Sequence, residues 1–138
     1  MGICLTSRKS DYSFNLSYNA FYMLRANICY AFDRELGKAY SNVLLSINNP
    51  EEYDEKIKQI LTDERFKDED IDIIRFFFDS DREGKCTYKT CKKIYDLIKD
   101  VDFKENKYLN KNDYDEIKLF LKECYQKRRM MIWYTKGV

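Results

Sequence analysis

Hydrophobic residues recur at helical spacing along most of the chain. Over residues 18–36 they return every three or four positions, which predicts a helix with one buried stripe. The stripe consists of Phe21, Leu24, Ile28, Phe32 and Leu36. Ser17 or Asn19 can cap the start of this helix. Gly37 either ends the helix or kinks it before a continuation over residues 38–47.

Four further helices are predicted by an N-cap residue that precedes a periodic hydrophobic run. The expected caps are Asn49, Asp68, Thr87 and Asn112. Pro50 follows the first cap at the position where a helix best accepts proline, and this helix is expected to end near residue 61.

The two ends of the chain alternate between apolar and polar positions instead, as β-strands do. Residues 3–7 and 131–135 show this pattern, and we expect them to pair. A short strand is also expected at Tyr108 and Leu109. The predicted fold is therefore mainly α: a single compact domain over residues 1–138, with about five to six helices and a short terminal two-stranded pairing. Residues 1–12 and 130–138 are expected to be extended or flexible.

The centre of the chain resembles a degenerate EF-hand calcium loop between two helices. If Asp79 is position 1, Gly84 occupies the sixth position, where such a loop turns sharply. The oxygen ligands would be Asp79, Asp81, Glu83, Thr87 and the backbone carbonyl of Lys85. Position 12 is Thr90 in place of the bidentate glutamate, so calcium would bind weakly. The alternative is a plain connection between two helices, in which Gly84 makes the turn and Thr87 caps the second helix.

Composition narrows the function classes. The chain contains no histidine, which excludes Ser-His and Cys-His catalytic pairs and zinc sites that contain histidine. We therefore expect a non-enzymatic protein without a resident cofactor. Residues 51–83 carry 13 acidic and 6 basic side chains, whereas residues 84–138 carry 8 acidic and 14 basic ones. This polarity favours docking to a partner, although solvated helix faces also give such numbers.

The cysteines and the N-terminal sequence indicate in which cellular compartment the protein is expected. Five cysteines form no CxxC pair, and neither a secretory leader nor an apolar run of about 18 residues is present. We expect reduced thiols, a cytoplasmic protein and no membrane span. The first six residues also fit an N-myristoylation pattern, with lipidation at Gly2 and Cys4, and the alternative for them is the strand described above.

The C-terminal segment combines cations with an aromatic side chain. The residues concerned are Lys127, Arg128, Arg129 and Trp133. Arginine and tryptophan are favoured in protein interfaces, and arginine also binds phosphates. Cations at the end of a helix can instead simply complement its dipole. Protein contact, nucleic-acid contact and a structural role all remain open for this segment.

Several segments together resemble a group of small uncharacterised proteins from phages and prophages of Gram-positive bacteria. They are residues 21–28, 33–37, 84–99 and 128–133. The resemblance implies no catalytic residues. The abundance of Asn, Lys, Ile, Tyr and Asp is compatible with an AT-rich genome, and such a genome suits a protozoan source equally well. The leading hypothesis is a phage- or prophage-encoded helical interaction protein that binds a host protein. The alternatives are an EF-hand-like calcium-binding protein, N-acylated at Gly2, and a nucleic-acid-binding protein that uses its basic C-terminal tail.

Overall fold

The computed structural model describes residues 2–7 and 13–136. Over these ranges it contains six α-helices and four β-strands. The helices are α1 (Tyr18–Phe32), α2 (Arg34–Leu44), α3 (Pro50–Leu61), α4 (Ile71–Phe78), α5 (Tyr88–Ile98) and α6 (Lys111–Gln126). The strands are β1 (Gly2–Ser7), β2 (Ser13–Leu16), β3 (Glu83–Cys86) and β4 (Met131–Lys136). The mainly α prediction is confirmed, but the β component is larger than predicted.

The strands form one antiparallel sheet in the order β2-β1-β4-β3. Its centre is the predicted pairing of the two chain ends, in which Ile3 lies opposite Thr135 and Ser7 opposite Met131. The two outer strands were not predicted, because each has only four residues and too short an alternation to stand out. They become strands by pairing with a neighbour that the rest of the chain holds in place.

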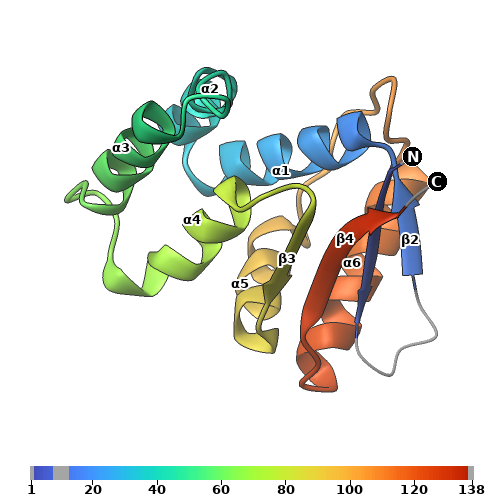
Figure 1. Cartoon of the computed structure of the whole chain (residues 1–138). Coiled ribbons are helices and arrows are strands. Elements are labelled where there is room, and N and C mark those ends of the chain that lie inside the picture. Colours follow the sequence, from blue (N-terminus) through green and yellow to red (C-terminus); the bar gives the residue numbers. More distant parts are fainter. Residues whose placement is uncertain (1, 8–12, 137–138) are drawn as a thin grey trace.

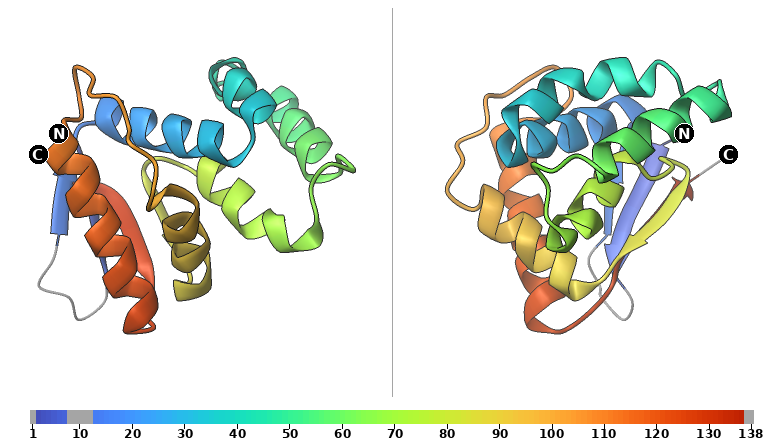
Figure 2. Two further views of the ribbon diagram at one scale, coloured as in Figure 1. Left: turned by 180° about the vertical axis from the view of Figure 1, so that it is seen from behind. Right: turned by 90° about the vertical axis from the view of Figure 1, so that its left-hand side faces the viewer.

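Helices cover one face of the sheet only (Figures 1 and 2). Seen from the side, α5 and α6 form a layer behind the sheet, and α1 crosses above it. Leu5 of the sheet meets Phe21 of α1 and Ile117 of α6 around a small interior gap. The side chain of Trp133 also points inward and is 0% exposed, with its ring 5.8 Å from that of Phe21 and 5.7 Å from that of Phe76.

The first long helix breaks at Asp33 and not at Gly37. Asp33 is extended, ends α1, and accepts a hydrogen bond from the backbone N–H of Leu36 to begin α2. Gly37 lies within α2 where this helix crosses α1. A Cβ atom at this glycine would lie 2.4 Å from the Cα atom of Tyr30, so the glycine permits the close crossing of the two helices.

Other helix boundaries agree with the sequence in part. The predicted caps Ser17, Asn49 and Thr87 each accept a hydrogen bond from the first turn of their helix. A short 3-10 turn, η1 (Asp68–Asp70), precedes α4, so Asp68 does not cap that helix directly. The last helix is capped by Asn110 and not by Asn112.

The expected strand at Tyr108 and Leu109 is an irregular turn. Its cause is the side chain of Asn106, which accepts hydrogen bonds from the backbone N–H groups of both residues. The turn leads directly into Asn110, whose cap begins α6.

The two ends of the chain lie in strands, and the cysteines are buried. Residues 2–7 and 131–136 are extended strands, and residues 1, 8–12, 137 and 138 lie outside the described ranges. All five cysteines are free thiols, and all are buried. Within the described ranges, every helix is too short or too polar to pass through a membrane.

Gly84 generates the first testable prediction. A Cβ atom at this position would lie 2.1 Å from Cζ2 of Trp133, whose ring is enclosed by the core. We expect Gly84→Ala to lower the free energy of unfolding by about 1–3 kcal/mol through overpacking. Urea unfolding followed by the fluorescence of Trp133, the one tryptophan in the chain, measures this change. Lys85→Ala, at the exposed neighbouring position, should stay within about 0.5 kcal/mol of the wild type. Equal stability of the two variants would contradict the prediction.

Candidate functional site: the uncovered face of the sheet

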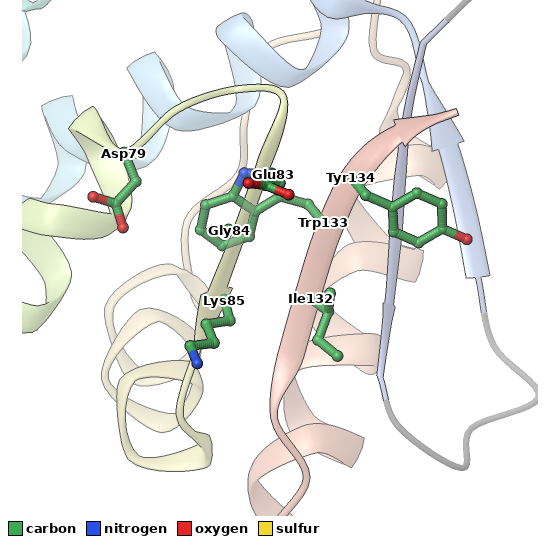
Figure 3. A pocket seen from close by; sticks show the side chains of 7 residues that line it. All are labelled: Asp79, Glu83, Gly84, Lys85, Ile132, Trp133 and Tyr134. Carbon is green, nitrogen blue, oxygen red and sulfur yellow. The ribbon is translucent and has the colours of Figure 1, made fainter. Parts of the chain in front are cut away.

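The face of the sheet opposite the helices is the most distinctive surface of the molecule. Because side chains alternate along a strand, β4 presents Ile132 and Tyr134 on this face, and β3 presents Glu83 and Lys85. Tyr134 is 42% exposed, and its ring extends across β1 (Figure 3). Within the described ranges, the helices lie on the opposite side of the sheet (Figure 2).

A hollow of about 570 Å³ lies on this face beside β3 (Figure 3). Its lining consists of Asp79, Glu83, Gly84, Lys85, Ile132, Trp133 and Tyr134. Asp79 comes from the end of α4 and stands across the hollow from β3. Acidic, basic, aliphatic and aromatic groups therefore surround one shallow depression.

The segment that enters β3 is held by the rest of the molecule. The guanidinium of Arg25 donates hydrogen bonds to the carbonyl oxygens of Phe76 (3.1 Å) and Asp79 (2.6 Å). Nε1 of Trp133 donates to the carbonyl of Ser80 at 2.8 Å. Because α1, α4 and β4 all contact this segment, the hollow has a fixed wall.

Arg25 is a buried cation, with 3% of its surface exposed. Among the residues that the structure describes, it forms no ion pair and its Nε has no hydrogen-bond partner. Its charge is stabilised instead by the negative carbonyl end of α4 and by the ring of Phe21, whose centroid lies 4.5 Å from the guanidinium carbon.

Two titratable groups of the face, Asp79 and Tyr134, have raised pKa values. Partial burial raises the pKa of Asp79, and the nearby guanidinium groups of Arg75 and Arg25 oppose this rise. A hydrogen bond with Cys4, its opposite neighbour in β1, raises the pKa of the Tyr134 phenol above its ordinary value.

The residues expected to hold calcium belong to several different elements. Glu83 and Lys85 belong to an extended strand, and Thr87 uses its hydroxyl to cap α5. Across the described ranges, no three acidic, cysteine or histidine side chains come close enough together to hold a metal ion, so Asp79, Asp81 and Glu83 form no such group. Thr87 caps α5 as the alternative predicted, but Gly84 lies within β3 and makes no turn, because this segment pairs with β4.

The basic C-terminal segment is divided by the fold. Lys127 and Arg129 both lie beside Glu123, at 3.0 and 3.6 Å, and Arg128 is exposed in the turn after α6 with φ 53°. Trp133 is buried, and this corrects the expectation that its ring contributes to an exposed contact surface. The inward direction of position 133 in β4 is the physical reason. The three cations alone remain at the surface or close to it.

The two expected lipidation sites lie within the sheet. Cys4 is 2% exposed in β1 between Tyr134 and Asn15. Gly2 lies opposite Lys136, and a Cβ atom there would come within 2.4 Å of the carbonyl oxygen of Leu16. Cys4 lies opposite Tyr134, whose ring extends across β1, so acylation of the buried thiol would require this ring to move. The strand alternative describes the structure.

The residues that sequence reasoning missed are Ile132 and Tyr134. The alternation over residues 131–135 indicated a strand, but only the one-sided helix layer determines which of its faces stays open. The sequence pattern predicts Glu83 and Lys85 as calcium ligands, whereas the structure places both in the edge strand β3.

Comparison of the chain with protein-family models, curated proteins and solved structures finds no match in any of the three. The resemblance to phage and prophage proteins therefore stays a prediction. The function has to be inferred from the geometry of the uncovered face.

The buried guanidinium generates a stability prediction. Arg25→Met keeps much of the apolar volume but leaves the carbonyl groups of Phe76 and Asp79 without their donor. We expect a loss of about 1–3 kcal/mol in the free energy of unfolding and faster amide exchange in residues 79–82. Urea unfolding and hydrogen–deuterium exchange measure the two effects. Arg75→Met on the exposed side of α4 is the matched control, and a wild-type exchange rate in Arg25→Met would refute the role of Arg25.

Asp79 generates a pH prediction. Its pKa is raised above the ordinary value of 3.8, so folding favours the protonated acid, and wild-type stability declines as the pH rises through the folded-state pKa. Asp79→Asn removes this loss and also a negative charge at the C-terminal end of α4. We expect the variant to exceed the wild type by about 0.3–1 kcal/mol at neutral pH, with the gap closing at pH values below 3.8. Urea titrations over this pH range measure the gap. Asp102→Asn in an exposed loop should show none, and a constant gap would contradict the assignment.

Proposed function

We propose that the chain is a non-enzymatic interaction protein that binds a protein of its host cell through the uncovered face of the sheet. The observation that carries this proposal is the one-sided architecture: helices cover the inner face, and the outer face presents an exposed tyrosine beside a hollow. Antiparallel sheets commonly leave one face to solvent, but such a face is usually polar. Here Ile132 and Tyr134 occupy its centre.

The chemistry of the face suits a protein partner. Tyrosine is favoured in interfaces because its ring supplies a large contact area and its hydroxyl can form a hydrogen bond. The ring of Tyr134 lies across β1, and the hollow next to it can receive a side chain of the partner. Glu83 and Lys85 border the same hollow with opposite charges. A partner segment with an apolar side chain between an acidic and a basic residue would match this arrangement.

The charged groups of the face support binding more than catalysis. Glu83 and Lys85 are exposed on an edge strand and take part in no ion pair among the described residues. Exposed charges of opposite sign can pair with complementary charges of a bound protein. The resemblance of the sequence to phage and prophage proteins favours a host protein as the partner.

A single substitution tests the proposal. Tyr134→Asp places a charge at the centre of the proposed interface, and we expect affinity for the partner to fall about 30-fold or more, as for loss of an interface hot spot. Proteins captured from an extract of the source cells by the wild type and by the variant are compared by quantitative mass spectrometry. Captured candidates are then purified and titrated individually.

The control carries the same substitution on a different surface. Tyr108 is 40% exposed in the turn before α6, so Tyr108→Asp has similar chemistry away from the sheet. The proposal requires a protein that binds the wild type and Tyr108→Asp equally and loses affinity for Tyr134→Asp. It fails if every captured protein binds all three forms alike.

A further inference from the structure

The outer edge of β3 carries unpaired backbone groups. The N–H of Thr135 donates to the carbonyl of Arg82 at 2.6 Å, so these two residues face each other through the ladder. The direction of backbone groups alternates along a strand, which turns Gly84 and Cys86 toward β4 as well. Glu83 and Lys85 therefore direct their N–H and C=O groups away from the sheet, and no described residue bonds to them. An edge of this kind is a template for another strand.

We propose that β3 pairs with β3 of a second copy of this chain, antiparallel and with Gly84 on the twofold axis. In this register Glu83 of one copy lies opposite Lys85 of the other, and the symmetry repeats the pair. Both residues direct their backbone groups outward, so each pair exchanges two backbone hydrogen bonds. The strand order becomes β2-β1-β4-β3-β3-β4-β1-β2.

The side-chain charges select this register. Glu83 and Lys85 both project from the uncovered face, and each would meet a side chain of opposite sign directly across the new pairing. Moving the twofold axis by one residue, to position 83 or 85, slides the strands by two residues and places Glu83 opposite Glu83 or Lys85 opposite Lys85. Like charges in that position repel. The edge is complementary to itself in one register only.

A hollow borders the edge where the second strand would lie. The hollow borders β3 on its outer side, with Asp79 across from the strand (Figure 3). Gly84, on the proposed axis, has no side chain, and this permits the close backbone approach of a pair without hydrogen bonds. The pairing would join the uncovered faces of two copies into one surface. This self-pairing is separate from the binding of a host protein, and it can be tested with the purified protein alone.

Charge reversal provides the test. Glu83→Lys places Lys opposite Lys at both pairs, and Lys85→Glu places Glu opposite Glu. Each variant alone should dimerise about tenfold or more weakly than the wild type. An equimolar mixture of the two restores opposite charges at both positions, so it should form heterodimers with wild-type affinity. The double variant Glu83→Lys/Lys85→Glu should dimerise with itself.

Sedimentation velocity from roughly 10 µM to 1 mM measures self-association, since an interface this small is expected to be weak. Energy transfer between differently labelled variants measures the heterodimer. Glu64→Lys and Lys104→Glu reverse exposed charges away from β3 and should dimerise like the wild type.

A wild type that stays monomeric throughout the range overturns the inference. So do single variants that associate like the wild type, or a mixture that fails to associate. Rescue in the mixture also excludes misfolding as the cause, because each variant must fold to complement the other. None of these results depends on a host protein, so failure here leaves the proposed function standing.

Discussion

The position of the uncovered face depends on one buried cation. Arg25 reaches from α1 to the carbonyl end of α4, where helix carbonyls lack partners within the helix. A buried charge without a carboxylate is costly, and the interaction is tolerable because the α4 dipole and the ring of Phe21 stabilise it. The same contact fixes the backbone of Asp79, four residues before β3 begins. The helical part and the sheet are thereby joined at the wall of the hollow.

The second constraint is that the chain ends form the centre of the sheet. Pairing β1 with β4 closes nearly the whole chain into a loop, and the packed helices between the two strands help to offset the entropy cost of this closure. Trp133 shows how the two parts support each other, because its ring packs on Phe21 and Phe76 and its N–H binds the carbonyl of Ser80. Gly84 makes room for that ring in the neighbouring strand.

Sequence patterns correctly predicted those features of the fold that depend on neighbouring residues, namely helix caps and the alternation of strands. Ser17, Asn49 and Thr87 cap helices as their side-chain chemistry requires, and the alternation of the chain ends identified the central pair of strands. The break at Asp33 was missed because helical spacing continues across it. The sequence also could not predict that Trp133 is buried and Tyr134 is exposed. The alternation places the two residues on opposite faces of the strand but does not indicate which face the helices cover. The candidate site could therefore not be predicted, although its strand could.

The charges of β3 have a second interpretation that the geometry can weigh. Edge strands often carry charged residues to prevent association, and this is the alternative role for Glu83 and Lys85. Protection of that kind works best when the charges share one sign, since every register then brings like charges together. Opposite signs two residues apart, around a glycine, repel in the neighbouring registers and attract in the central one. A lone Lys would have protected the edge at less risk, so the Glu-Gly-Lys order favours selective pairing over prevention.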